Sequence, residues 1–165
     1  MTLSRRQLLK TMAVLPAVTL PLTGLSLASA GLTPITLHSA RGPHKLNAEM
    51  ATTPAQRRTG LMAREYLPAD QGMLFTYSRP QPPSSGFWMY RTRIPLDIAF
   101  IDGEGKILAL HTMSPCRSEN PADCPAYPAG VAFQAALEVN AGYFKDKGIE
   151  LGDCISVPGL DVSCR

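Results

Sequence analysis

Proline and glycine divide the chain so closely that few long helices or strands can form. After residue 30 they account for 25 of 135 residues, compared with roughly 12% in an average protein. Proline lacks the backbone donor that a helix or an inner strand needs, and glycine loses more backbone freedom on folding than other residues. The sequence therefore predicts a turn-rich fold built from short elements.

The first thirty residues have the order of an export signal rather than of a folded element. The pair Arg5-Arg6 and Lys10 precede a moderately apolar stretch, and the small residues Ala28-Ser29-Ala30 follow it. This order of charged, apolar and cleavage regions predicts a cleaved signal peptide over 1–30. The arginine pair and the leucines after it resemble the twin-arginine export signal, although Leu8 stands where an aromatic residue is commoner.

The apolar stretch of this segment is a poor candidate for a membrane anchor. Pro16, Pro21 and Gly24 interrupt it, and it is shorter and more broken than a bilayer-spanning helix requires. No cysteine follows the cleavage site directly, so a lipid anchor is not expected either. We expect a periplasmic or secreted protein that meets the export machinery through residues 1–30 and keeps no stable membrane anchor.

The formal charge of +3 belongs wholly to the first thirty residues. Residues 31–165 hold thirteen Lys and Arg and thirteen Asp and Glu, so the exported domain is formally neutral. A nucleic-acid-binding surface typically shows clustered Lys and Arg with interleaved aromatic residues, and the sequence has no such run. Nucleic acid is therefore not an expected partner, and a few placed arginines would have to select a small polar or anionic ligand.

All four cysteines lie in the last third of the chain: Cys116, Cys124, Cys154 and Cys164. An even number of cysteines in an exported protein predicts disulfides. Pairing Cys116 with Cys124 and Cys154 with Cys164 is the simplest of three connectivities, because each bridge then closes a short loop. The spacings match neither the usual zinc knuckle nor the Cys-x-x-Cys redox motif, while mixed or free thiols remain alternatives.

Short apolar segments between turn residues predict seven or eight strands and two short helices. The strands are expected at 35–38, 46–51, 73–77, 87–90, 94–101, 106–112, 132–140 and 154–157, with a hairpin turn at 102–105. The helices are expected at 55–63, after the N-cap Thr53, and at 141–147, before Gly148. Residues 78–86 contain three prolines and are expected to be irregular.

The order of these segments also limits the fold class. Strands and helices do not alternate regularly, which argues against a parallel α/β sheet. We therefore expect a single mainly β domain over 31–165. Its architecture is expected to be a small antiparallel β-sandwich or barrel-like domain with two short helices.

Five sequence blocks, taken together, resemble a known family. They are TPAQRRTGLMAR at 53–64, GMLF at 72–75, FWM with IPLDIAFID at 87–102, LEVNAG at 137–142, and GI with GD at 148–153. Their order and spacing are similar to those of the domain-of-unknown-function family numbered 192 (DUF192), over about 48–157. The resemblance implies a compact sandwich- or barrel-like β domain. It implies no reaction, since the family has no established activity, and at 90–92 the chain has Tyr-Arg-Thr where the family more often has Lys-Asn-Thr.

Arginines near the first predicted helix are candidate ligand-binding residues. Arg58 and Arg64 lie on or near this helix, and a guanidinium can hold a carboxylate or phosphate through two hydrogen bonds. Trp88, in the predicted strand 87–90, could line the same pocket with an arginine over its ring. The simpler alternatives are a solvated helix face for the arginines and core packing for the tryptophan.

Three polar residues in predicted strands are the other candidates. Asp97 is the only charged residue in the apolar strand 94–101, so it must be exposed, paired or hydrogen-bonded. Glu138 and Asn140 are two residues apart in the late strand and therefore point to one side. If Glu138 lay near Asp97, the two carboxyl groups would form a pair of the kind used in acid–base catalysis.

These candidates support three hypotheses about function. The first is a periplasmic small-ligand-binding or accessory module with a polar pocket formed by Arg58, Arg64, Trp88, Asp97, Glu138 and Asn140. The second is a hydrolase-type enzyme that uses Asp97 and Glu138, and the third is a scaffold for protein interaction. The sequence does not decide whether the protein is an enzyme. No cofactor is predicted, and the spacing of the three histidines does not indicate a metal site.

Overall fold

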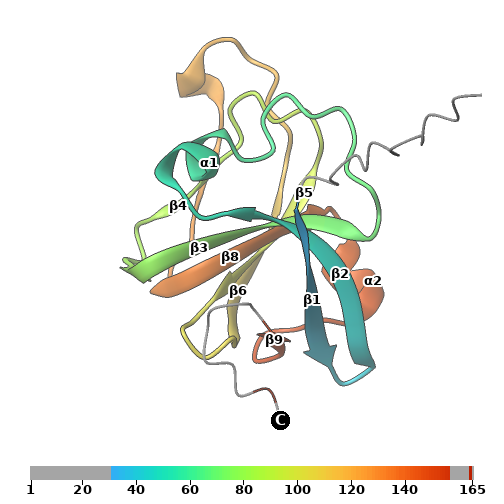
Figure 1. Cartoon of the computed structure of the whole chain (residues 1–165). Coiled ribbons are helices and arrows are strands. Elements are labelled where there is room, and N and C mark those ends of the chain that lie inside the picture. The colour runs from blue at the N-terminus through green and yellow to red at the C-terminus, as the bar shows by residue number, and fades with distance from the viewer. Residues whose placement is uncertain (1–30, 157–163, 165) are drawn as a thin grey trace, which may run out of the picture.

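The computed structural model describes residues 31–156 and Cys164. These residues form a curled sheet with short helices beside it (Figure 1). Nine strands and two short α-helices make the described part mainly β, which confirms the predicted fold class. The predicted signal peptide, 1–30, lies outside the described residues. Within the described part, no helix is long and apolar enough to cross a membrane.

Seven strands form the main sheet in the order β6-β5-β8-β3-β2-β1-β9. Their bounds are β1 Leu32–Ser39, β2 Gly42–Ala51, β3 Gln71–Gln81, β5 Leu96–Ile101, β6 Ile107–Met113, β8 Phe133–Asn140 and β9 Cys154–Ser156. The two other strands, β4 (Gly86–Trp88) and β7 (Ala126–Pro128), pair with each other. Helix α1 spans Pro54–Thr59, α2 spans Tyr143–Lys147, and a 3-10 turn spans Pro121–Asp123.

One pair of strands departs from the antiparallel arrangement that the sequence predicts. β2 and β3 are parallel, with Ala51 opposite Phe75, so the main sheet is mixed. The connection between them, 52–70, returns from the end of β2 to the start of β3 and contains α1. Parallel strands need such a long connection, whereas a tight hairpin joins only antiparallel strands.

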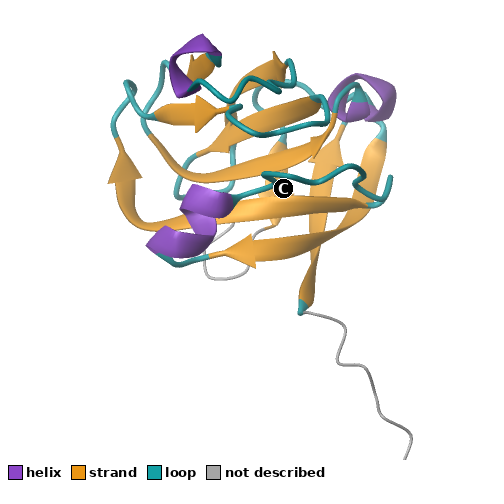
Figure 2. Ribbon diagram, turned by 90° about the horizontal axis from the view of Figure 1, so that it is seen from above, coloured by secondary structure: helices purple, strands orange, loops and turns teal. Residues whose placement is uncertain are grey.

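The sheet curls into a partly closed barrel (Figure 2). Backbone hydrogen bonds link the hairpin between β5 and β6 to the segment around β9, at the opposite edge of the sheet. The Ile107 N–H donates to the Asp153 carbonyl over 2.8 Å, and the Ile155 N–H donates to the Gly105 carbonyl over 2.7 Å. These contacts protect part of both edges, which in an open sheet would expose unpaired backbone groups.

Both faces of the central strands are buried, as β5 shows with six buried residues out of six. Ala99 and Ile101 pack inside the curl with apolar residues of β1, β8, β9 and α2, and we call this side the barrel face. Leu96, Ile98 and Phe100 pack on the other side, which we call the outer face. The outer core includes Leu61, Met89 and both cysteines of one disulfide, so the segments around α1, β4 and that disulfide cover this face.

Helix α1 begins where the sequence predicts and ends earlier. The Thr53 hydroxyl accepts from the Gln56 N–H over 3.2 Å, and the Gln56 side chain accepts from the Thr53 N–H over 2.9 Å, forming a capping box. The Gly60 N–H closes the last turn by donating to the Gln56 carbonyl over 2.8 Å. The helix therefore has six residues instead of the predicted span 55–63.

Strand β3 extends into the segment that the sequence predicts to be irregular. β3 runs to Gln81 and β4 begins at Gly86, so the prediction for 78–86 was wrong at both ends. The pairing of β3 with β8 shifts register between Thr76 and Gln81. Such an irregularity accommodates Pro80, which cannot donate a hydrogen bond to a neighbouring strand.

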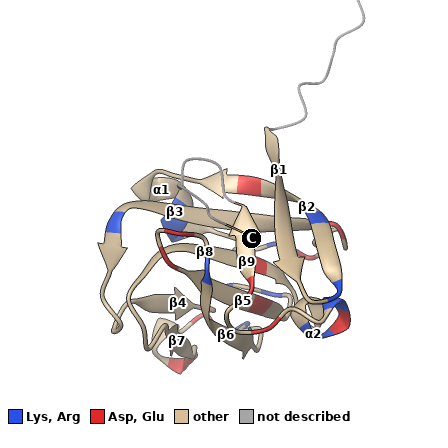
Figure 3. Cartoon of the chain, turned by 90° about the horizontal axis from the view of Figure 1, so that it is seen from below, with Lys and Arg blue, Asp and Glu red and all other residues tan. Residues whose placement is uncertain are grey.

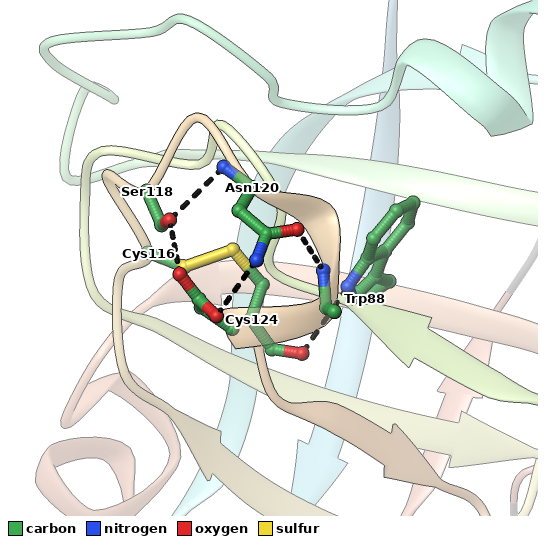
Figure 4. Close-up of a disulfide and its surroundings, with 7 residues drawn as sticks. Trp88, Cys116, Ser118, Asn120 and Cys124 are labelled. Carbon is green, nitrogen blue, oxygen red and sulfur yellow. Dashed lines mark hydrogen bonds between the residues drawn. A yellow bond between two sulfur atoms is a disulfide. The ribbon is translucent and has the colours of Figure 1, made fainter.

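Both local disulfides that the cysteine order predicts are present. Cys116 is bonded to Cys124, and Cys154 is bonded to Cys164. The first bridge closes the loop before β7. The Asn120 side chain also holds the 3-10 turn within this loop (Figure 4). Two disulfides are compatible with a protein outside the cytoplasm, because reducing conditions inside cells disfavour them.

Candidate functional site

A pocket of about 210 Å³ lies on the outer face of the sheet, between α1 and β4. It is lined by Arg57, Arg58, Thr59, Gly60, Leu61, Met62, Phe75, Tyr77, Gly86, Phe87, Trp88, Thr92 and Glu138. Three of the six predicted site residues, Arg58, Trp88 and Glu138, therefore come together here. Pockets for drug-sized ligands usually measure about 300–1,000 Å³, so this one suits a compact molecule.

Glu138 lies at the base of this pocket with only 6% of its surface exposed. It projects from β8 onto the outer face, opposite Ile98 of β5 and Met73 of β3. No described residue forms an ion pair or a hydrogen bond with its carboxyl group. Burial alone raises the pKa of Glu138 from its ordinary 4.5 to about 8. At neutral pH the carboxyl group is therefore mainly protonated, and it can both donate and accept a hydrogen bond.

The disulfide loop holds Trp88 at the edge of the pocket. The indole N–H donates to the Cys124 carbonyl over 3.3 Å (Figure 4), and the ring stacks on Tyr90 with centroids 4.9 Å apart. The pairing of β4 with β7 requires Gly86, since a Cβ there would lie 2.3 Å from the Tyr127 carbonyl oxygen. Trp88 is nonetheless 44% exposed, which leaves part of its ring free to contact a ligand.

The two arginines of α1 differ in how they are held. The Arg57 guanidinium donates to the carbonyls of Thr52 (2.5 Å) and Thr76 (2.9 Å) and lies 4.7 Å above the Tyr77 ring. These contacts fix Arg57 in place. Arg58 has no ion pair within the described residues, so its guanidinium is available to a ligand. Elsewhere, acidic and basic positions are interspersed along the ribbon (Figure 3), so the positive charge of the pocket is a local feature.

Asp97 lies on the barrel face, away from this pocket. In the pairing of β5 with β8, Asp97 is opposite Val139, whereas Glu138 is opposite Ile98. Successive residues of a strand point to opposite faces of the sheet, so the two carboxyl groups are separated by the sheet itself. The acid–base pair of Asp97 and Glu138, which the sequence left open, is therefore not formed.

The contacts of Asp97 are those of a structural residue. Its carboxylate accepts from the Thr112 hydroxyl over 2.7 Å and from the Gly142 N–H over 2.8 Å. Gly142 is the N-cap of α2, and a carboxylate there satisfies a backbone donor that the helix itself cannot pair. Asp97 therefore ties β5 and β6 to the start of α2.

Arg64 and Asn140 also lie outside the pocket. The Arg64 guanidinium donates to both carboxylate oxygens of Glu49 over 2.5 and 2.6 Å, and this hydrogen bonding raises the pKa of Arg64. The Asn140 amide donates to the carbonyls of Leu67 and Pro68 over 3.0 and 3.2 Å. Both residues anchor the long connection 52–70, so the six predicted residues do not form a single site.

Two aromatic residues of β3 also line the pocket, although the sequence did not indicate them as candidates. Phe75 and Tyr77 are two residues apart, so they share a face, and that spacing was the available signal. Phe75 meets Phe87 edge-to-face with centroids 4.7 Å apart. The pKa of Tyr77 is raised chiefly by burial and also by the nearby Glu138, while Arg57 opposes this change.

A wider hollow of about 390 Å³ lies elsewhere, beside Arg91, Arg93 and Arg117. In it, Arg91 pairs with Glu119 over 3.1 Å and Arg93 pairs with Glu65. All four paired side chains are about half exposed or more, and exposed ion pairs of this kind need no ligand. The unpartnered buried carboxyl group makes the smaller pocket the stronger candidate.

The described residues also bear on metal binding. Among residues 31–156 and Cys164, no three His, Cys, Asp or Glu side chains are grouped so that they could hold a metal ion. The histidines of β1 and β2 contact serines instead: His38 lies 3.0 Å from the Ser156 hydroxyl and His44 lies 3.0 Å from the Ser39 hydroxyl.

The fold and the pocket can be compared with known proteins. The model of the domain-of-unknown-function family 192, described as an uncharacterized ACR, matches residues 35–157. The chain belongs to the DUF192 family. This confirms the resemblance seen in the sequence blocks, and it leaves the activity open because the family description names none. No curated protein matches the chain.

Two of the five solved chains that match this DUF192 protein are informative about its fold. One, from Sinorhizobium meliloti 1021, is described as a proposed transcription regulator and is 34% identical to this chain. Its TM-score is 0.70, and the match covers 80% of this chain and 98% of that one. The other, a protein of unknown function from Novosphingobium aromaticivorans DSM 12444, is 30% identical with a TM-score of 0.68, and the match covers 80% and 89%. Both likenesses extend over most of the DUF192 domain.

Proposed function

We propose that this DUF192 protein is an exported small-ligand-binding module whose ligand occupies the pocket above Glu138. The observation that carries the proposal is the Glu138 carboxyl group, which is buried, unpartnered among the described residues, and part of the pocket lining. Among the described residues, His111 Nε2 is the only fully buried side-chain polar atom without a partner, so the Glu138 carboxyl oxygens still reach the space of the pocket. A ligand in the pocket can therefore complete the hydrogen bonds of this carboxyl group.

The remaining lining favours binding over hydrolysis. Besides Glu138, the titratable groups that line the pocket are Arg57, Arg58 and Tyr77. A hydrolase that uses two carboxyl groups would need a second one on this face, and Asp97 lies on the other. The aromatic wall and the free guanidinium of Arg58 are features that position a small molecule.

The chain carries its own reporter for testing this proposal. Trp88 is the only tryptophan in the sequence, so intrinsic fluorescence reports on the pocket. We would titrate sugars, nucleosides, amino acids and organic acids into the protein and follow fluorescence and thermal unfolding. A ligand at 100 times its Kd should add roughly 2.7 kcal/mol of stability.

A pair of variants on α1 gives the control. Thr59→Phe places a large side chain in the pocket lining and should abolish the response, whereas Ala55→Phe, on the same helix but outside that lining, should keep it. If no compound gives a saturable response, or if Thr59→Phe binds as the wild type does, the proposed function is wrong.

The proposed location rests on the signal-like segment 1–30 and on the two disulfides. We propose export by the twin-arginine route. Replacing Arg5 and Arg6 with lysine should leave the uncleaved precursor inside the cell, as cell fractionation would show. Unchanged export of that double variant would contradict this route.

A further inference from the structure

The charge of the pocket restricts what it can bind. Its charged lining residues are Arg57, Arg58 and Glu138, so the lining is net positive even when Glu138 is ionised. When Glu138 holds its proton, the lining contains two positive charges and no negative one. Binding sites attract ligands of opposite charge, so this balance favours an anion over a cation or a neutral molecule.

The hydrogen-bonding groups of the pocket point to the same conclusion. The Arg58 guanidinium only donates, and a protonated Glu138 carboxyl group has an O–H to donate. Tyr77 and Thr92 supply hydroxyl groups that can donate as well. The carbonyls of Thr52 and Thr76 already accept from Arg57. An acceptor-rich group such as a carboxylate matches a lining of this kind.

The surroundings of Glu138 keep it in the donor state near neutral pH. The charged and titratable groups that line the same pocket are Arg57 and Arg58 from α1 and Tyr77 from β3, while the β5 neighbour of Glu138, Ile98, is apolar. His111 of β6 is on the same face beyond Ile98 and packs against Phe100 with ring centroids 5.7 Å apart. Burial raises the pKa of Glu138 to about 8.

We infer, building on the proposed function, that the ligand is a small organic anion with an apolar body. Arg58 ion-pairs with its anionic group, the Glu138 carboxyl O–H donates to one of its oxygens, and its body packs against Phe87 and Trp88. Binding then requires Glu138 to keep its proton, so affinity is lost as the pH rises through the pKa of about 8.

The experiment compares three compounds of one shape: benzoate, benzamide and benzyltrimethylammonium, which are an anion, a neutral molecule and a fixed cation. Each is titrated into the protein at pH 7 and at pH 9 while Trp88 fluorescence is followed. Benzoate should bind more tightly than the other two at pH 7. Its affinity should fall about tenfold at pH 9, because only about a tenth of the protein then has Glu138 protonated.

Two pairs of variants separate the roles of the residues. Glu138→Gln keeps a donor that does not titrate, so it should lose the pH dependence, whereas Glu119→Gln, in an exposed ion pair outside the pocket, should retain it. Arg58→Ala should weaken benzoate binding at least tenfold, whereas Arg117→Ala, outside this lining, should not.

Several results would overturn the inference. If benzyltrimethylammonium binds more tightly at pH 9 than at pH 7, and if Glu138→Gln abolishes that binding, Glu138 is a carboxylate partner for cations. Binding of benzamide as tight as that of benzoate, unaffected by Arg58→Ala, would make the ligand neutral. If benzoate does not bind while the wider compound screen yields another class of ligand, the anion inference fails and the proposed function stands. If nothing binds at all, both fail.

Discussion

Asp97 and Glu138 are acidic residues on adjacent strands, one position apart in the strand pairing. Their side chains lie in different environments. Asp97 is 4% exposed and Glu138 is 6% exposed. Asp97 faces the barrel core and accepts two hydrogen bonds. Glu138 faces the outer side, has no partner among the described residues, and borders a pocket.

This contrast shows that burial alone does not identify a functional acid. A buried carboxylate that accepts hydrogen bonds from a hydroxyl and from a helix N-cap is part of the fold. A buried carboxyl group that lacks such contacts destabilises the domain, and it is functional only if something else completes its hydrogen bonds. The two residues therefore predict different responses to mutation.

The largest expected effect is the pH dependence that Glu138 imposes on stability. The folded protein keeps a proton that the unfolded chain releases between its ordinary pKa of 4.5 and about pH 8. The free energy of unfolding should therefore fall by on the order of 5 kcal/mol in total as the pH rises through this window. Above the window it should level off. Urea unfolding at pH 5, 7 and 9 measures it.

The variant Glu138→Gln isolates this contribution. It should flatten the pH profile and be more stable than the wild type at pH 9, because no charge then has to be buried. Glu119→Gln, whose side chain is 85% exposed, should keep the wild-type profile. A Glu138→Gln profile parallel to that of the wild type would show that Glu138 titrates normally.

The next effect concerns Asp97. Asp97→Ala leaves the Gly142 N–H and the Thr112 hydroxyl without their acceptor, and it should cost about 3 kcal/mol of unfolding free energy. Asp97→Asn keeps an acceptor and should cost less. Ligand binding at the pocket should be unchanged in folded Asp97→Asn, and a loss of binding there would break the separation of the two faces.

The disulfide loop should have an intermediate effect. Replacing Cys116 and Cys124 together with serine removes a short closed loop and should cost about 2–3 kcal/mol. Because the backbone carbonyl of Cys124 accepts from the Trp88 indole, loosening this loop should also move the fluorescence maximum. The double replacement of Cys154 and Cys164 is the matched control, which should lower stability without moving that maximum.

The smallest effect is expected for Trp88→Phe. The variant loses one hydrogen bond to a backbone carbonyl and part of a stacked pair, which together are worth about 1 kcal/mol. Thermal unfolding should therefore change little, while calorimetric affinity for benzoate should fall. A large loss of stability would assign Trp88 to the fold rather than to the pocket.

The sequence predicted the general architecture because its signals are local. The hairpin around 102–105, the Thr53 cap and the two disulfide pairs each depend on residues close together in the chain. It did not predict the parallel pairing of β2 with β3, which depends on where a nineteen-residue connection (52–70) returns. It also missed the extension of β3 past Pro80, which depends on an irregular register with β8.

The site was predicted in part for a similar reason. Arg58, Trp88 and Glu138 were found because they are charged or aromatic residues within distinctive blocks. Whether Glu138 meets Asp97 or Arg58 depends on which strand face each occupies, and that register is set by pairing between distant segments. A single sequence does not contain that pairing explicitly, so the candidate set mixed residues from both faces.

The most direct test is a carboxyl carbon NMR titration of Glu138 in the folded protein, assigned with Glu138→Gln. We expect a pKa of about 8 for Glu138, which rises further when benzoate is bound, because the bound anion favours the protonated form. A Glu138 carboxyl group that titrates near 4.5, or whose pKa falls when benzoate binds, would contradict the claim that this residue is a buried donor in a ligand pocket.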